Sequence, residues 1–261
     1  MALVVMASSS AFPSPAEMNA LQDLFISAGG EFWRWRPEVI EVDSQVIVVG
    51  SPWDFTTNAS SGEYLYNPCG SDVNIKWQGI TCVNSSVYKL ELIVFDLDGT
   101  IPDSIGQFGN LTSMQMFGNP KLSGTIPSTV GDLRHLQRID FNMNGMTGSL
   151  PSSMSKLSLL NELYISENFL TGTIPSEFGK LTALELVYLA DNRLSGTLPS
   201  AVGMLTGIYL LALDYNLLTG TIPPELGQLS KIEDIGISNC DLTGTIPVEL
   251  ANMPSVIFFF L

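Results

Sequence analysis

Apolar residues occur in pairs, with one residue between the two members, at a regular interval along most of the chain. Seven such pairs follow one another at spacings of 24 or 25 residues: Leu90 and Leu92, Met114 and Met116, Ile139 and Phe141, Leu163 and Ile165, Val187 and Leu189, Leu211 and Leu213, and Ile235 and Ile237. Alternation of this kind is typical of a short strand with one buried face. The pattern therefore predicts seven equivalent strands in a repeating unit.

A Gly-x-(Ile or Leu)-Pro tetrad follows each apolar pair. The tetrads begin at Gly99, Gly124, Gly148, Gly172, Gly196, Gly220 and Gly244. The first interval is 25 residues and the others are 24, because Pro120 adds one residue to its unit. After each proline comes a segment such as 176–181, where proline fits the first position of a helical turn and Glu177 lies near its positive end. Each unit is therefore predicted to contain a strand, a turn and a short helical piece.

Asparagine recurs four residues before the glycine in four of the units, at Asn144, Asn168, Asn192 and Asn216. A side-chain amide at this point can satisfy backbone groups of a tight turn and of the adjacent coil. Cys240 occupies the same position in the seventh unit and is interpreted as a small buried side chain. No unit can bury its apolar side alone, so the units must be stabilised by stacking.

The repeated pattern Leu-x-x-Leu-x-Leu-x-x-Asn-x-Leu-x-Gly-x-Ile-Pro resembles the plant-type leucine-rich repeat. That class occurs in receptor kinases, receptor-like proteins and polygalacturonase-inhibiting proteins. The resemblance implies an α/β solenoid, a right-handed superhelix with a parallel β-sheet on its concave face and short helical or 3-10 turns on its convex face. Residues 87–261 would form seven full repeats and part of an eighth.

Residues 17–86 resemble the N-terminal cap of the same family. They contain a predicted helix around 20–26, then Trp33, then Pro68-Cys69 and the segment 77–82, which ends at Cys82. A disulfide between Cys69 and Cys82 is chemically reasonable in an oxidising compartment, and the resemblance implies it. The two cysteines are further apart than is usual in the family, and the stretch 37–66 is long, so the geometry of this cap is expected to be unusual.

Residues 1–16 have an apolar run before small residues, as in a secretory signal segment, but carry no Lys or Arg and have a short apolar core. They are interpreted as a degenerate or truncated signal. Three Asn-x-Ser/Thr sequons, at Asn58, Asn84 and Asn110, agree with secretion. We expect a secreted or cell-surface protein. The Ser-Ala-Phe-Pro junction at 10–13 resembles plastid-targeting presequences of algae, so a plastid or another endomembrane-derived compartment is the alternative.

Composition narrows the classes of partner. The 261 residues are 45% hydrophobic and 14% charged, which argues against disorder. The net charge of −15 argues against a nucleic-acid partner. No apolar stretch reaches the 18 or more residues typical of a membrane helix, so no membrane segment is expected in this chain.

Residues 92–104 resemble the first motif of haloacid-dehalogenase-like phosphatases, with Asp96 as the nucleophile and Asp98 as the acid/base. The string 96–100 is, however, in phase with the repeats, because Gly99 opens the first tetrad and Leu92 belongs to the first apolar pair. A motif is meaningful only in its structural context. With a single histidine, His135, we expect no catalytic residues, no cofactor and no metal site, and a phosphatase stays a remote alternative.

Binding is expected on the predicted sheet, where the residues that flank the apolar pairs point to solvent. The predicted site comprises acidic residues, tyrosines and one arginine: Arg138, Asp140, Glu162, Tyr164, Glu185, Tyr188, Tyr209, Asp214, Tyr215, Glu233 and Asp234. Tyrosines offer contact area at low entropic cost, and carboxylates favour a basic partner. We expect a protein or peptide ligand of basic character. A receptor-like protein in signalling or defence and an inhibitor of cell-wall hydrolases both fit this pattern.

The last six residues, Val256 to Leu261, are all apolar and match the strand of an eighth repeat. No polar cap follows them in the sequence. An uncapped parallel edge favours association. Two interpretations are open: the chain continues in a longer protein, or a partner covers this edge.

Overall fold

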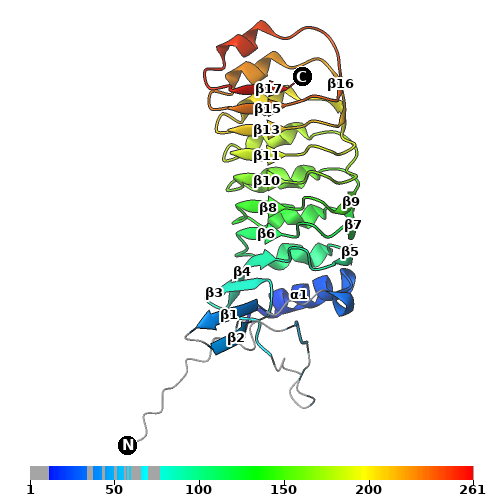
Figure 1. Ribbon diagram of the computed structural model, residues 1–261, viewed down its shortest axis with the longest axis vertical. Coiled ribbons are helices and arrows are strands. Elements are labelled where there is room, and N and C mark those ends of the chain that lie inside the picture. The colour runs from blue at the N-terminus through cyan, green and yellow to red at the C-terminus, as the bar shows by residue number, and fades with distance from the viewer. Residues whose placement is uncertain are drawn as a thin grey trace, which may run out of the picture.

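The computed structural model describes residues 12–33, 38–42, 45–49, 52–55, 57, 59, 66–69 and 77–260. From residue 77 onward the chain winds into a single stack of coils, with the N-terminal cap at one end and β17 at the other (Figure 1). Each coil contributes a short strand to one long sheet and a 3-10 helix to another side of the stack. The predicted solenoid is therefore confirmed.

The main sheet has nine strands and is called the long sheet below. Its strands lie in the order β17-β15-β13-β11-β10-β8-β6-β4-β3, and all neighbours are parallel except β3 and β4. The bounds are β3 Ile80–Val83, β4 Ser86–Glu91, β6 Ser113–Gln115, β8 Arg138–Asp140, β10 Glu162–Tyr164, β11 Leu186–Tyr188, β13 Leu210–Ala212, β15 Asp234–Gly236 and β17 Phe258–Phe260.

The central residue of each repeat strand points into the core, and its two neighbours lie on the exposed face. In β10, β11 and β13 the central Leu163, Val187 and Leu211 are buried, whereas the flanking residues are half-buried. These three residues are also aligned by the strand pairing. Because the repeat length sets the register, residues 24 apart form straight rows across the long sheet.

The helical side of the stack consists of seven 3-10 helices, each begun by the proline of its tetrad. Their bounds are η2 Asp103–Gln107, η3 Ser128–Asp132, η4 Ser152–Lys156, η5 Ser176–Lys180, η6 Ser200–Met204, η7 Pro224–Gln228 and η8 Val248–Asn252. In η5, for example, Pro175 is the N-cap with φ −62°. A fixed φ near this value prepares the chain for a helical turn, as predicted.

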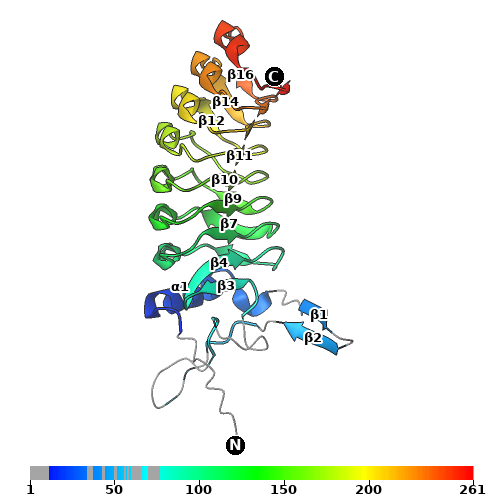
Figure 2. The same ribbon diagram turned by 90° about the vertical axis from the view of Figure 1, so that its left-hand side faces the viewer.

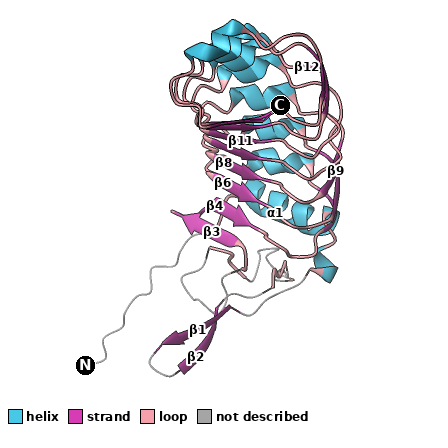
Figure 3. Cartoon of the chain, turned by 45° about the horizontal axis from the view of Figure 1, so that its top comes forward, coloured by secondary structure: helices cyan, strands magenta, loops and turns pink. Residues whose placement is uncertain are grey.

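Two smaller parallel sheets lie on a further side of the coils, apart from the long sheet (Figure 3). One has the order β5-β7-β9 and the other β12-β14-β16. Their bounds are β5 Asp98–Thr100, β7 Lys121–Thr125, β9 Gly145–Thr147, β12 Ser195–Thr197, β14 Leu217–Gly220 and β16 Asp241–Leu242. They contain four of the tetrad glycines, Gly99, Gly124, Gly196 and Gly220. Gly196, for example, has φ +74°, a conformation that glycine adopts without strain.

A row of buried asparagines joins successive coils, as the spacing predicted. Asn168 accepts a 3.0 Å hydrogen bond from the Met146 amide of the preceding coil and donates one of 2.8 Å to the Phe141 carbonyl. Asn192 and Asn216 make the equivalent bonds one and two coils further on. In the seventh repeat the Cys240 thiol faces the Leu213 carbonyl at 3.5 Å in place of the amide.

The row has one more member than the four asparagines that the spacing predicts. Asn119 is fully buried and accepts the Phe95 and Leu97 amides while donating to the Leu92 carbonyl. It lies five residues before its glycine, because Pro120 displaces it by one position.

The cap begins with helix α1, Pro15–Ser27, which is longer than the predicted 20–26 and starts inside the predicted signal segment 1–16. Residues 1–11 of that segment lie outside the described residues. Aromatic rings attach α1 to the rest of the cap: the ring of Phe25 in α1 lies 5.4 Å from that of Trp33. The Trp33 and Trp53 rings are 4.9 Å apart, and Trp53 stacks on Trp77 at 5.7 Å.

The long insertion of the cap contains elements that the sequence did not predict. The short helix η1, Gly30–Phe32, lies before the insertion, and within the insertion β1, Glu38–Val42, and β2, Gln45–Val49, form an antiparallel hairpin. The hairpin projects away from the stack at its N-terminal end (Figure 2).

At the other end, β17 pairs in parallel with β15, which places Phe258 opposite Asp234. The eighth strand is thus present as predicted. Ile257 and Phe258 are 65% and 55% exposed, so this end presents apolar side chains. Association through the edge stays a prediction. No helix in the described part of the chain is both long and apolar enough to cross a membrane.

Candidate binding face

Four of the predicted site residues form one network on β8 and β10. The Arg138 guanidinium forms ion pairs with Glu162 and, at 3.1 Å, with Asp140. It also lies over the Tyr164 ring, 4.6 Å from the ring centre. The Tyr164 hydroxyl donates a 3.2 Å hydrogen bond to Glu162, which closes the network.

This network fixes charge and orientation before any ligand arrives. Burial, followed by the nearby Glu162 carboxylate, raises the pKa of Tyr164, so its hydroxyl keeps its proton at neutral pH. The pKa of Arg138 is also raised, since its hydrogen bond to Asp140 and the Glu162 charge outweigh the opposing effect of burial. Arginine is always charged in proteins, and the network therefore presents a fixed cation between two carboxylates.

Tyr188 extends the network along the sheet. Its ring stacks on the Tyr164 ring with centres 5.0 Å apart and planes 20° apart. The pairing of β10 with β11 sets the two tyrosines opposite each other. Aromatic pairs in this geometry are stabilising, and here they provide a rigid surface at the middle of the long sheet.

The second group of predicted residues comprises Asp214, two residues beyond the end of β13, and Asp234, the first residue of β15. The Asp214 carboxylate accepts hydrogen bonds from the Ser238 amide at 2.9 Å and from its hydroxyl at 2.7 Å, and it lies against Gly236. Burial, and then the charge of Asp214, raises the pKa of Asp234. Within the described residues, neither carboxylate has an ion-pair partner.

Apolar residues, none of them among the predicted site residues, lie between these two groups. Leu186 and Leu210 follow Glu162 in its row of the exposed face, and Ala212 follows Tyr188 in the next row. All three are half-buried. The face therefore changes from a charged network on β8 and β10 to an apolar floor on β11 and β13 with carboxylates beyond it.

Glu185, Tyr209 and Glu233 were predicted to lie on the strands, and this placement is wrong by one position. Each precedes its strand, and its backbone carbonyl accepts a hydrogen bond from the next repeat, as in the 2.7 Å bond from the Tyr209 amide to Glu185. Because β11, β13 and β15 have only three residues each, the residue two positions before the central one lies just outside the N-terminal end of its strand. All three side chains are exposed, with Lys231 lying 5.5 Å from the Tyr209 ring.

Tyr215 lies beyond the end of β13, in the turn that leads to the asparagine row. Its φ is +55° and its side chain is 55% exposed. It is thus available on the far side of the face, one residue after Asp214. Its binding role, like that of the other ten predicted residues, stays a prediction.

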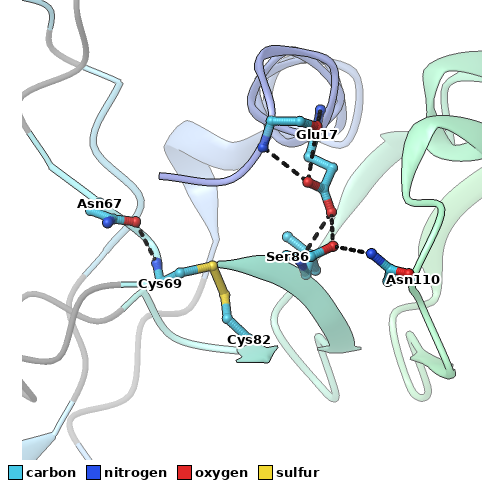
Figure 4. Close-up of a disulfide and its surroundings, with 8 residues drawn as sticks. Glu17, Asn67, Cys69, Cys82, Ser86 and Asn110 are labelled. Carbon is cyan, nitrogen blue, oxygen red and sulfur yellow. Dashed lines mark hydrogen bonds between the residues drawn. A yellow bond between two sulfur atoms is a disulfide. The ribbon is translucent and has the colours of Figure 1, made fainter. Parts of the chain in front are cut away.

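The predicted disulfide is present: Cys69 and Cys82 are bonded, with Cα atoms 5.4 Å apart (Figure 4). Asn84 and Asn110 are both exposed, and the Asn110 amide donates a 3.0 Å hydrogen bond to the Ser86 hydroxyl. Asn110 lies between η2 and β6, where the chain returns from the helical side to the long sheet. Asn58 falls outside the described residues.

The phosphatase-like string has an ordinary place in the first repeat. Asp98 is in β5 and its carboxylate pairs with Lys121 at 3.4 Å, while Asp96 lies in the turn before it with φ +59°. In the part of the chain that the structure describes, no group of three or more His, Cys, Asp or Glu side chains is arranged to hold a metal ion.

Comparison with known proteins agrees with this architecture. The sequence model of the Leucine Rich Repeat family matches residues 159–181 and 183–205. Over 80 residues the chain is 35% identical to the LRR receptor-like serine/threonine-protein kinase GSO2 of Arabidopsis thaliana; the match covers 30% of this chain and 6% of the kinase.

Solved structures of plant receptors are similar over much longer stretches. The crystal structure of PEPR1-AtPEP1 covers 94% of this chain, with a TM-score of 0.76 and 27% identity. The Arabidopsis receptor kinase HAESA, in complex with the peptide hormone IDA and the co-receptor SERK1, covers 70% at a TM-score of 0.65 and 34% identity. The chain spans 31% of the length of each of these two receptor chains.

Proposed function

Because the chain is a leucine-rich-repeat protein with repeats of the plant receptor type, we propose that the exposed face of its long sheet recognises a peptide or protein ligand. The recognition would serve a receptor-like protein in signalling or defence. The observation that carries the proposal is the network of Arg138, Glu162, Tyr164 and Tyr188, an ordered group of charged and aromatic side chains on an otherwise regular sheet.

The physical character of the face suits a macromolecular partner better than a small molecule. Its residues lie in straight rows across parallel strands, which gives an extended surface for an extended segment of chain. Ordered aromatic and arginine side chains dominate binding energy at protein interfaces. The structural relatives include receptors crystallised with peptide hormones, which supports a ligand of this class.

We further propose that the protein acts on the extracellular side of a membrane. The Cys69–Cys82 disulfide supports this placement, because disulfides persist in oxidising compartments. The two exposed sequons at Asn84 and Asn110 are compatible with it. The ligand is proposed to be basic, since Glu162, Asp214 and Asp234 lie on or beside the strands of the face.

The test is a comparison of two surfaces of the same protein. The chain is used to capture proteins and peptides from extracellular fluid, and the affinity of each identified partner is then measured with purified material. We expect a variant with Tyr164→Ala, Tyr188→Ala and Tyr215→Ala to bind at least about tenfold more weakly, since truncating an aromatic hot-spot residue costs about 2 kcal/mol or more. The control, Glu177→Ala on the helical side, should bind like the wild type.

Unchanged affinity of an identified partner for the triple variant would overturn the proposal. The nature of the partner decides the role. A purified cell-wall hydrolase that binds and loses activity would assign the chain as an inhibitor, whereas a secreted peptide would support the receptor-like role.

A further inference from the structure

One side of the tyrosine stack already holds an arginine. Arg138 lies 4.6 Å over the Tyr164 ring and is bound by the carboxylates of Glu162 and Asp140. A guanidinium on an aromatic face with carboxylates at its edge combines a cation–π contact with charge-assisted hydrogen bonds. An arginine side chain on this sheet is therefore bound by two features, an aromatic ring beneath its guanidinium and carboxylates at its edge.

On the other side of the stack the next two positions in the same row of the sheet are small residues, and Phe260 of β17 follows them. Tyr164 is followed by Tyr188, then by Ala212, then by Gly236, each aligned with the last by strand pairing. Adjacent strands are about 4.8 Å apart, so these two small residues leave a step roughly 10 Å wide beside the Tyr188 ring. Gly236 is buried and Ala212 is half-buried. Because an alanine side chain cannot cover an aromatic face, the part of the step above Ala212, beside the Tyr188 ring, is open to a ligand.

A carboxylate is fixed at the edge of the step. One oxygen of Asp214 is held by the amide and hydroxyl of Ser238, at 2.9 and 2.7 Å. The other oxygen lies against Gly236 so closely that a Cβ at this position would collide with it. The glycine therefore allows the carboxylate to lean over the row that contains Ala212.

The charge at this edge is not neutralised by the protein. Neither Asp214, which follows β13, nor Asp234 of β15 forms an ion pair among the residues described, and the two carboxylates repel each other. At the Arg138 end, by contrast, two carboxylates share a cation. Both ends of the tyrosine stack have an aromatic face with carboxylates nearby. Only the Tyr164 end also has an arginine of the chain, Arg138, bound to them.

We infer that Tyr188, Ala212, Asp214 and Gly236 form a subsite for an arginine side chain of the ligand. This inference rests on the proposed function and assigns its first specific contact. The guanidinium would stack on Tyr188 above Ala212 and donate hydrogen bonds to Asp214. Arginine suits the subsite better than lysine, because its planar group can stack on the ring and bind the carboxylate at the same time.

The experiment uses short synthetic peptides with the whole chain, so it does not need the natural ligand. The peptide acetyl-Gly-Ala-Arg-Ala-Gly-amide is titrated into the isotope-labelled protein, and the affinity is measured from NMR shifts of residues 188, 212 and 236. Matched peptides carry lysine or citrulline in place of arginine. Citrulline keeps the planar shape without the charge, and we expect it to bind about tenfold more weakly.

Two variants test the subsite itself. Asp214→Asn retains an oxygen that can accept the Ser238 hydrogen bonds but removes the charge, and should weaken arginine-peptide binding about tenfold. Ala212→Leu fills the step and should have at least as large an effect. The matched control is Glu167→Gln, which removes one exposed charge beyond β10 and should change the affinity by less than about twofold. Unchanged thermal midpoints confirm that the variants fold.

Equal binding of the arginine and citrulline peptides would overturn the inference. Equal weakening by Asp214→Asn and Glu167→Gln would also overturn it, because binding would then depend on net charge alone. The proposed function can fail independently: if an identified partner binds the face and the peptides show no arginine preference, only the subsite is wrong. If the arginine peptide binds here but no partner depends on Tyr164 and Tyr188, only the proposed function is wrong.

Discussion

The Glu17 carboxylate in α1 accepts a 2.6 Å hydrogen bond from the hydroxyl of Ser86, the first residue of β4 (Figure 4). The same oxygen accepts the Val87 amide at 3.0 Å, and the other oxygen accepts the amide and hydroxyl of Ser14 at 3.0 and 2.9 Å. One side chain thus caps its own helix and fastens the cap to the first repeat.

Replacing this carboxylate is expected to loosen the cap. Glu17→Ala removes the helix cap and leaves the buried Val87 amide without its acceptor, which should lower the free energy of unfolding by about 2–4 kcal/mol. Urea unfolding followed by far-UV circular dichroism measures the change. The control Asp23→Ala alters an exposed acid of the same helix and should stay within about 0.5 kcal/mol. Equal effects of the two changes would contradict the role given to Glu17.

Two substitutions in the asparagine row are expected to change the stability of the chain in opposite directions. Asn168→Ala leaves the buried Met146 amide without its acceptor, whereas the Phe141 carbonyl keeps its 2.8 Å bond from Asn144, and the change should cost about 2 kcal/mol. Cys240→Asn should complete the row by bonding the Leu213 carbonyl, and we expect it to stabilise the chain by about 1 kcal/mol. Thermal unfolding and amide hydrogen exchange near residues 213–242 check both. A destabilised Cys240→Asn variant would show that the seventh repeat cannot accommodate the larger amide.

The 24-residue period of the sequence was sufficient to predict most of the solenoid, because equivalent residues form the same element in each repeat. Every tetrad proline begins a 3-10 helix, and both members of every apolar pair are buried. The hairpin β1–β2 could not be predicted in this way, because it lies in an insertion of the cap where the 24-residue pattern does not occur. The helix start, however, was readable: Ser14 and Glu17 have the spacing of a capping box.

The candidate site was predicted less completely than the fold. Arg138, Glu162 and Tyr164 were placed correctly from alternation alone, but that rule gives no information on which side chains meet. The step beside Tyr188 depends on Ala212 and Gly236, which attract no attention in a search for charged or aromatic residues. Its significance arises only when strands 24 residues apart are brought side by side.

The Cys69–Cys82 disulfide should matter for the cap more than for the repeats. It closes a loop with a sequence separation of 13, for which chain-entropy arguments suggest a contribution of about 3 kcal/mol. The double change Cys69→Ser and Cys82→Ser should therefore make the cap sensitive to proteolysis while the repeats stay folded, as limited digestion with mass spectrometry would show. Cys240→Ser, which removes the free thiol, is the control and should leave cleavage in the cap unchanged. Simultaneous digestion of cap and repeats would contradict the local role.

Asp234 should make the stability of the C-terminal coils depend on pH. Its pKa is raised by burial and then by the Asp214 carboxylate, so the folded chain binds this proton more tightly than the unfolded chain does. The ionised carboxylate therefore destabilises the fold at neutral pH, and this destabilisation is lost as the pH falls through the raised folded-state pKa. Asp234→Asn should raise the thermal midpoint at neutral pH, and its advantage over the wild type should shrink towards zero at about pH 3, where an ordinary Asp carboxyl is protonated.

Asp191→Asn, which changes an exposed acid two coils away, is the control for net charge. If the advantage of Asp234→Asn persisted undiminished at low pH, the cause would be packing of the amide, and the repulsion between Asp214 and Asp234 would have no part in it.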